Sequence, residues 1–177
     1  MGNPLNLPFD PIERAHENWR AHWGASPAMA AVTSVMRAQQ LLIGQLDATL
    51  KPFELTFARY EALVLLTFSS TGALPLGKIG ERLMVHPTSV TNTIDRLERQ
   101  EFVRRRPNPS DGRGTLAEIT DTGRDVVERA TRELLAMDFG LDCYSEEELW
   151  HVHELFVKLR VSFGDFPESA ARERPRA

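Results

Sequence analysis

The sequence predicts an α+β fold that is mostly α, and three features support this prediction. Two short segments between Leu76 and Val103 repeat apolar residues at helical spacing. Two strand-like segments follow directly and flank the turn-forming stretch PNPSDGRG. Long stripes of apolar residues lie before and after this region. Together these features predict a winged helix-turn-helix at residues 56–120 with long N- and C-terminal dimerisation helices.

The composition is that of an ordinary globular protein. The 177 residues are 42% hydrophobic and 26% charged, which suits one compact domain or one domain with helical extensions. No apolar run approaches the roughly 18 residues that a membrane-spanning helix needs. The N-terminus lacks the basic start and apolar core of a secretion signal, and the single cysteine suits a reducing compartment. We therefore expect a cytoplasmic protein without a membrane partner.

Three helices are expected before the helix-turn-helix. Residues 1–27 form an N-terminal extension with one short helix, for which Asp10 is placed as the N-cap. An apolar stripe predicts a longer helix at residues 29–50, and an amphipathic helix of that length usually packs on a partner helix. Thr56 can cap a third helix at residues 57–70, which would join the helix-turn-helix to the helical remainder.

Two tryptophans share one face of the first predicted helix. Trp19 and Trp23 are four residues apart, which brings them to the same side of a helix. In one interpretation both indoles pack this helix onto the body of the protein. In the other, Trp19 lines a ligand pocket together with His16 and Arg20. The residues alone leave both interpretations open.

The second helix of the helix-turn-helix starts near His86, because Pro87 suits the first turn of a helix. If its apolar residues face inward, the opposite face carries short polar groups and then cations: Thr88, Ser89, Thr91, Asn92, Asp95, Arg96 and Arg99. A helix that enters a DNA major groove by its N-terminal end needs small polar groups near base edges and longer cations near phosphates. An ordinary solvated face is the alternative, and this helix alone does not decide between them.

The arginine-rich hairpin favours DNA binding. Strand-like segments at residues 102–106 and 115–120 flank the turn, and six arginines lie between Arg96 and Arg113 against three acids. The whole chain has a net charge of −4, so this one basic segment concentrates the anion-binding surface. Consecutive residues of a strand point in opposite directions, so Arg104, Arg105 and Arg106 cannot all face DNA.

Two further helices are expected after the hairpin. Thr120 begins a long one, and Ser145 with Glu148 forms a capping box for the last one, which continues to Phe163. The early and late apolar stripes have little else in the chain to cover them, which points to a dimer. The predicted helical dimerisation region comprises residues 28–55 and 121–164. The polar, proline-containing tail, residues 165–177, is expected to be disordered.

These residues resemble the MarR family of bacterial transcriptional regulators. The resemblance extends from Ala28 to Phe163 and is carried by PTSVTNTIDRLERQEFVRRRPNPSDGRG and by EITDTGR. It implies a wing in which Arg113 reaches into a minor groove and Asp111 braces the wing. It also implies a homodimer with interlocking terminal helices, whose pseudo-palindromic operator has half-sites about ten base pairs apart. The candidate DNA-binding residues are Pro87, Thr88, Ser89, Thr91, Asn92, Arg96, Arg99, Arg106, Asp111 and Arg113.

The resemblance also implies a small-molecule effector. MarR-like regulators commonly bind small aromatic or anionic compounds, and a urate-responsive subset adds an N-terminal helix. At the ligand positions of that subset, Trp19 and Arg105 match, Glu61 replaces an aspartate and Thr93 replaces an arginine. The candidate ligand-binding residues are His16, Trp19, Arg20, Glu61 and Arg105.

The predicted function is a ligand-responsive, DNA-binding repressor that acts as a homodimer on double-stranded DNA. No glycine-rich phosphate loop, nucleophile elbow or paired-cysteine motif is present, so neither catalysis nor a cofactor is expected. One alternative is a winged-helix module for protein–protein interaction. Another is a metal-sensing regulator of the same fold, in which Glu147 and His151 share a helix face. We predict no metal site.

Overall fold

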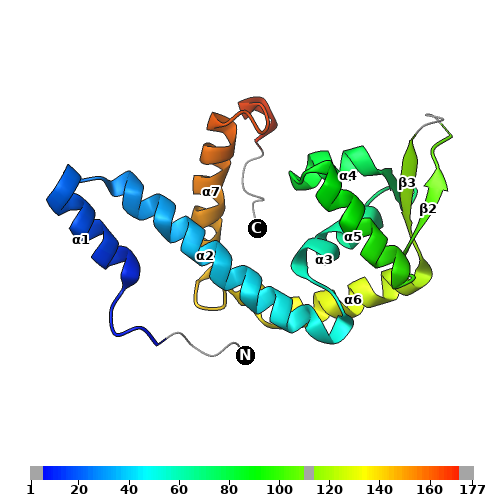
Figure 1. The fold of residues 1–177 in the computed structure, drawn as a ribbon, viewed down its shortest axis with the longest axis horizontal. Helices are drawn as coiled ribbons and strands as arrows, with labels where there is room; N and C mark the ends of the chain where they lie inside the picture. Colours follow the sequence, from blue (N-terminus) through cyan, green and yellow to red (C-terminus); the bar gives the residue numbers. More distant parts are fainter. Residues whose placement is uncertain (1–5, 110–113, 172–177) are drawn as a thin grey trace. The chain divides into compact units, whose positions relative to one another are not determined.

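The computed structural model describes residues 6–109 and 114–171 of the chain. The chain divides into two compact units, residues 1–136 and 137–177. The first unit contains a helix-turn-helix and a small antiparallel sheet, with further helices before and after them in sequence (Figure 1). The predicted α+β, mostly α, fold class is therefore confirmed.

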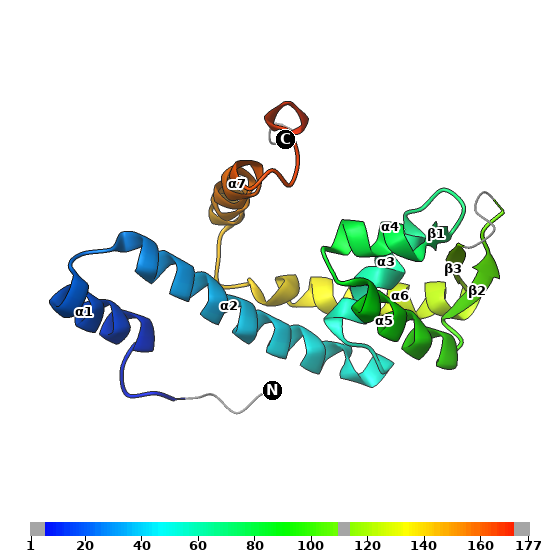
Figure 2. The same ribbon diagram turned by 45° about the horizontal axis from the view of Figure 1, so that its top comes forward.

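The first two helices begin at the predicted positions. α1 (Pro11–Trp23) has Asp10 as its N-cap, whose carboxylate accepts a hydrogen bond from the backbone N–H of Ile12 at 2.8 Å. Gly24 ends the helix with a φ of +88°, a conformation that glycine adopts without a Cβ clash. α2 (Pro27–Leu50) follows after a short turn, and α1 packs against it (Figure 2).

The third helix has a cap that differs from the predicted one. α3 (Phe57–Thr67) follows the short 3₁₀ turn η1 (Lys51–Phe53), and the Thr56 side chain makes no capping hydrogen bond. Instead, Asp47 of α2 accepts a hydrogen bond from the backbone N–H of Phe57 at 2.6 Å. A carboxylate at this position satisfies a first-turn N–H and interacts favourably with the helix dipole. The cap therefore also links α2 to α3.

The helix-turn-helix consists of α4 (Leu76–Leu83) and α5 (Pro87–Arg99). His86 is the N-cap of α5, and its Nδ1 accepts a hydrogen bond from the backbone N–H of Thr88 at 3.3 Å. The apolar residues of both helices pack inward as the spacing predicted. Those that are buried are Ile79, Val90, Ile94 and Leu97, and they meet the buried residues Tyr60, Ala62, Leu63 and Leu66 of α3.

A three-stranded antiparallel sheet completes this region. Its order is β1-β3-β2, with β1 (Ala73–Pro75), β2 (Val103–Pro107) and β3 (Thr115–Ile119). Strands β2 and β3 form the predicted hairpin, whereas β1 is a strand that the sequence analysis did not predict. A strand of three residues is too short to produce an alternating pattern, and its proline is tolerated at a sheet edge.

α6 (Asp121–Ala136) begins directly after β3 and packs against α3. Gly123 lets the start of α6 lie close to the backbone just before β2, because a Cβ there would collide with the carbonyl oxygen of Phe102. Further along the helix, the Tyr60 hydroxyl lies 2.9 Å from Thr131 Oγ1. These contacts join α6 to the core beneath the helix-turn-helix.

The second unit contains α7 (Glu146–Ser162), preceded by the 3₁₀ turn η2 (Asp138–Gly140). The predicted capping box is confirmed, because Ser145 Oγ accepts from the Glu148 N–H while the Glu148 carboxylate accepts from the Ser145 N–H at 2.8 Å. No residue of α7 is buried. Within the described ranges, no helix combines the length and apolar content that a bilayer crossing requires.

The start of the C-terminal tail is structured. Residues Glu168–Ala170 form a further 3₁₀ turn, η3. Before this turn, Arg160 of α7 lies 3.7 Å from the Asp165 carboxylate and 4.9 Å from the ring centre of Phe166. The described part of the tail, up to Ala171, thus differs from the disorder that the sequence suggested. Residues 172–177 lie outside the described part of the chain.

Candidate nucleic-acid interface

The outer face of α5 presents short polar side chains to solvent. Thr88, Ser89, Thr91 and Asn92 are all exposed. The Thr91 hydroxyl donates to the Pro87 carbonyl at 3.1 Å. Among the described residues, no side-chain hydrogen bond occupies the hydroxyls of Thr88 and Ser89 or the amide of Asn92. These three groups can therefore donate to or accept from a partner outside the chain.

Two cations follow on the same helix. Arg96 and Arg99 are both exposed, and within the described residues neither forms an ion pair. Arg99 donates to the backbone carbonyl of Asp95 at 3.2 Å. The helix therefore presents neutral hydrogen-bonding groups first and unpaired cations one to two turns later. This order suits a helix whose first turns contact base edges and whose later turns contact phosphates.

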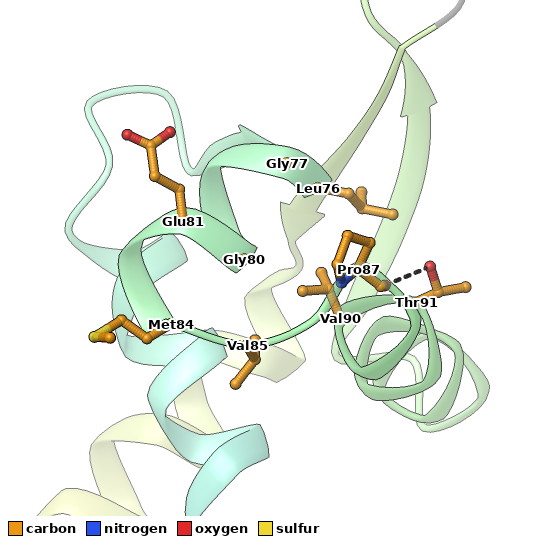
Figure 3. Close-up of a pocket in the computed structure, with 9 residues that line it drawn as sticks. All are labelled: Leu76, Gly77, Gly80, Glu81, Met84, Val85, Pro87, Val90 and Thr91. Atoms are coloured by element: carbon orange, nitrogen blue, oxygen red, sulfur yellow. Dashed lines mark hydrogen bonds between the residues drawn. The ribbon is translucent and has the colours of Figure 1, made fainter.

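A groove between α4 and α5 borders this face (Figure 3). It has a volume of about 450 Å³ and is lined by Leu76, Gly77, Gly80, Glu81, Met84, Val85, Pro87, Val90 and Thr91. The one ionisable group in this lining is Glu81, which Lys78 pairs at 2.8 Å. Because the lining has no cation, the groove does not fit an anionic ligand.

Arg104 and Arg106 share one carboxylate on the wing. Glu118 of β3 lies opposite Arg104 in the strand register. It accepts hydrogen bonds from Arg104 Nε at 2.8 Å and from Arg106 Nη1 at 3.0 Å. The two arginines hold the pKa of Glu118 at about 2, below its ordinary value of 4.5. Arg106, a predicted DNA-binding residue, is therefore exposed but already has an anionic partner.

Arg105 points to the other face of β2, as strand alternation predicted. Its guanidinium contacts Asp95 and Glu98 on α5, and it is the least exposed of the three consecutive arginines. Burial works against the charged form, but the hydrogen bonds to Asp95 and Glu98 outweigh it and raise the pKa of Arg105. The sequence contained a signal for this pairing: two acids three residues apart on α5, followed by an arginine-rich strand.

The structure does not gather the predicted ligand-binding residues into one site within a single chain. His16, Trp19 and Arg20 lie on α1, which packs on α2, whereas Glu61 lies on α3 and Arg105 on β2. Partial burial raises the pKa of the Glu61 carboxyl, and the ion pairs of Arg105 among the described residues are with Asp95 and Glu98, not with Glu61.

The two tryptophans of α1 lie together on its outer side. Their ring centres are 4.7 Å apart, and Trp23 is 72% exposed. Packing of both indoles onto the body is therefore wrong for Trp23. The side that α1 turns toward α2 includes the half-buried residues Ile12, Ala15 and His16.

The structure gives no information on the predicted wing tip, and its described residues give little support for a metal site. Asp111 and Arg113, the wing-tip pair, lie outside the described residues. In the part of the chain that the structure describes, no three His, Cys, Asp or Glu side chains cluster in a way that could hold a metal ion. Glu147 and His151, the pair considered for metal sensing, are both exposed on α7.

Comparison with protein families and curated proteins points to one group of regulators. The sequence profile of the MarR family matches residues 58–115, from α3 to the start of β3. YhbI of Bacillus subtilis, described as an uncharacterized HTH-type transcriptional regulator, is 30% identical over 96 residues, 54% of this chain and 61% of YhbI. The HTH-type transcriptional regulator PecS of Dickeya dadantii is 27% identical over 135 residues, 74% of this chain and 80% of PecS. The chain thus spans about three fifths of YhbI.

Two crystal structures from Streptomyces coelicolor extend the comparison. Sco5413, a MarR family transcriptional regulator, is 64% identical, with a TM-score of 0.76 over 81% of this chain and 100% of that one. Sco3205, a MarR family regulator in complex with DNA, is 23% identical, with a TM-score of 0.72 over 84% of this chain and 97% of that one. The second likeness concerns the fold alone.

Proposed function

This chain belongs to the MarR family of transcriptional regulators, and we propose that it represses transcription by binding duplex DNA as a homodimer. α5 enters a major groove, and the wing that β2 and β3 form lies along the adjoining backbone. A small aromatic or anionic effector in the cytoplasm releases the DNA.

The exposed face of α5 is the observation that carries this proposal. Thr88, Ser89 and Asn92 offer hydrogen-bonding groups that no other described side chain uses, and the unpaired Arg96 and Arg99 follow them. Neutral groups of this kind read base edges, whereas cations bind phosphates. The likeness of the fold to Sco3205, whose crystal structure contains DNA, supports the same use of this face.

Exposed apolar residues on the helices outside the winged helix-turn-helix support the homodimer. Such residues on α2 are Val32, Val35, Met36, Leu41 and Ile43, and on α7 they are Val152, Leu155, Phe156 and Leu159, with Phe163 directly after the helix. Apolar area on this scale is costly to leave in water, so each stripe favours a partner surface. A two-fold dimer presents two α5 helices to successive major grooves, about ten base pairs apart on a pseudo-palindromic operator.

Release follows from a shift between two dimer geometries. An effector that binds the DNA-incompetent geometry more tightly lowers the population that matches both half-sites. The difference in the effector's affinity for the two geometries sets the largest shift that it can produce.

A mobility-shift titration tests the DNA-binding function. The purified protein is titrated against the duplex that flanks its own gene, at two salt concentrations, with a random duplex as competitor. We expect a complex that survives the competitor and weakens steeply with salt, because phosphate contacts release counterions. Absence of any complex at low salt would remove DNA binding and favour the protein-interaction alternative.

A further inference from the structure

Arg105 joins the recognition helix α5 to the wing. Its guanidinium lies between two carboxylates of α5, with Nη2 2.6 Å from Asp95 Oδ1 and Nη1 2.5 Å from Glu98 Oε2. Glu98 also accepts a hydrogen bond from the backbone N–H of Arg105 at 3.1 Å. Three polar contacts therefore connect the last two turns of α5 to the central residue of β2.

This arrangement fixes direction as well as distance. Asp95 and Glu98 are three residues apart, so they lie on one face of α5 and hold the guanidinium at two points along the helix. A planar guanidinium donates to each carboxylate in a defined direction, which a lysine ammonium does not reproduce. Two points of attachment resist rotation of the strand relative to the helix, whereas a single ion pair would leave that rotation free.

Exposure distinguishes Arg105 from its neighbours. Its side chain is 26% exposed, against 64% for Arg104 and 58% for Arg106. Both terminal nitrogens of Arg105 already face carboxylates. A phosphate would have to displace Asp95 or Glu98 to reach it, whereas Arg104 and Arg106 are more exposed and share a single carboxylate, that of Glu118. Arg105 is therefore poorly placed for a phosphate contact and well placed to orient the wing.

On the basis of the DNA-binding function proposed above, we propose that Arg105 is a positioning residue. Held by Asp95 and Glu98, it fixes the angle between α5 and the wing and so determines sequence selectivity without touching DNA. The arginine also offsets part of the negative charge of the two carboxylates, which lie on a helix that approaches phosphates.

The test compares four proteins: the wild type, Arg105→Met, Asp95→Asn, and the variant with both substitutions. Arg129→Met is the matched control, since Arg129 pairs with Asp125 at 2.9 Å on α6, outside the winged helix-turn-helix. For each protein, affinity for the flanking duplex and for a random duplex is measured across a salt series. Thermal unfolding shows whether each variant is folded. Asp95→Asn preserves side-chain size, so it tests the proposal even if Arg105→Met does not fold.

We expect either single substitution to lower the ratio of specific to random affinity about tenfold, as loss of one base-reading contact would. The salt slope should stay unchanged, whereas a lost phosphate contact would lower it by about 0.9. The double variant should lose no more selectivity than a single one, because both substitutions break the same interaction. Arg129→Met should match the wild type.

Two results would overturn the inference while leaving the proposed function intact. One is unchanged selectivity in folded Arg105→Met or Asp95→Asn. The other is a lower salt slope in Arg105→Met with additive losses in the double variant, which would make Arg105 a phosphate contact. A wild-type protein that binds no duplex at low salt would overturn the proposed function and this inference together.

Discussion

The Glu118 carboxylate of β3 accepts hydrogen bonds from two arginines of β2, and this shared contact determines how the wing responds to acid. Arg104 and Arg106 both donate to its carboxylate, so each keeps a fixed direction on the outer face of the hairpin. DNA phosphates would compete with Glu118 for the same two guanidinium groups. The carboxylate thus orients the arginines in the free protein, and DNA phosphates would replace it as their partner in a complex.

The shifted pKa of Glu118 gives the first prediction. Its folded-state pKa of about 2 lies below the ordinary 4.5, so ionised Glu118 stabilises the fold above pH 4.5, and this contribution disappears as pH falls through about 2. Glu118→Gln should therefore unfold more easily than the wild type at pH 7, with the difference vanishing between pH 4.5 and 2. Denaturant unfolding of both proteins across this window measures it. A difference that stays constant with pH would show that charge is not involved.

The sequence was enough to predict which residues of α5 are buried and which are exposed, but not which residues the wing arginines contact. Helical spacing places Val90 and Ile94 inside and Asn92 outside, because it depends only on neighbours three or four residues away. The contacts of Arg105 and Arg106 depend on strand register and on where α5 meets β2. Those are set by packing across the fold, which a local pattern does not contain.

The second prediction concerns α5, because substitutions of its polar residues and of its arginines should affect DNA binding in different ways. Asn92→Ala should relax sequence preference, since it removes a base-edge contact worth about 1–3 kcal/mol. Arg96→Ala should weaken binding to all duplexes alike. It should also lower the slope of log affinity against log salt by about 0.9, the value for one phosphate contact. Competition assays with specific and random duplexes separate the two. Equal losses on every sequence for Asn92→Ala would reassign that face to backbone contact.

The cap of α3 gives the third prediction. Asp47 accepts from the Phe57 N–H across 10 residues of chain, so Asp47→Ala should destabilise the protein by about 1 kcal/mol, as loss of a helix cap does. Thr56→Ala is the control, because the Thr56 hydroxyl caps no backbone N–H and instead accepts a hydrogen bond from Arg59 Nε at 3.3 Å. Denaturant titration compares the two variants. A larger effect at Thr56 would restore the cap that the sequence suggested.

Helices could be predicted closely because their signals are local, and elements that depend on a distant partner could not. The caps at Asp10 and Ser145 were visible as residue types at fixed offsets, and the structure confirms both. β1 exists only because Ala73–Pro75 can pair with β3, and the α3 cap exists only because α2 passes nearby. In both cases the deciding partner lies on another element, outside the few neighbouring residues that a local pattern covers.

The last prediction concerns assembly. Leu155 of α7 is 69% exposed, although it is apolar. If α7 packs against a second copy, Leu155→Lys should shift the protein to monomer, because a charge buried in an apolar interface is costly. DNA affinity should then fall at least about 100-fold, since binding at two half-sites gains from effective concentration. Light scattering coupled to size exclusion measures the mass, and a mobility shift measures the affinity.

His153→Lys is the control for that experiment. It adds the same charge to α7 on the opposite side of the helix and removes no apolar side chain. A dimeric Leu155→Lys protein, or an equal effect of both substitutions, would remove this stripe of α7 from the interface.

The three tryptophans make the protein its own optical reporter. Trp19 and Trp23 lie on α1 and Trp150 on α7, so the winged helix-turn-helix, residues 56–120, has no indole of its own. Tryptophan fluorescence therefore reports on α1 and α7 rather than on local changes in the wing or in α5. An effector that alters tryptophan emission at unchanged DNA occupancy would locate its action at those helices, without any added dye.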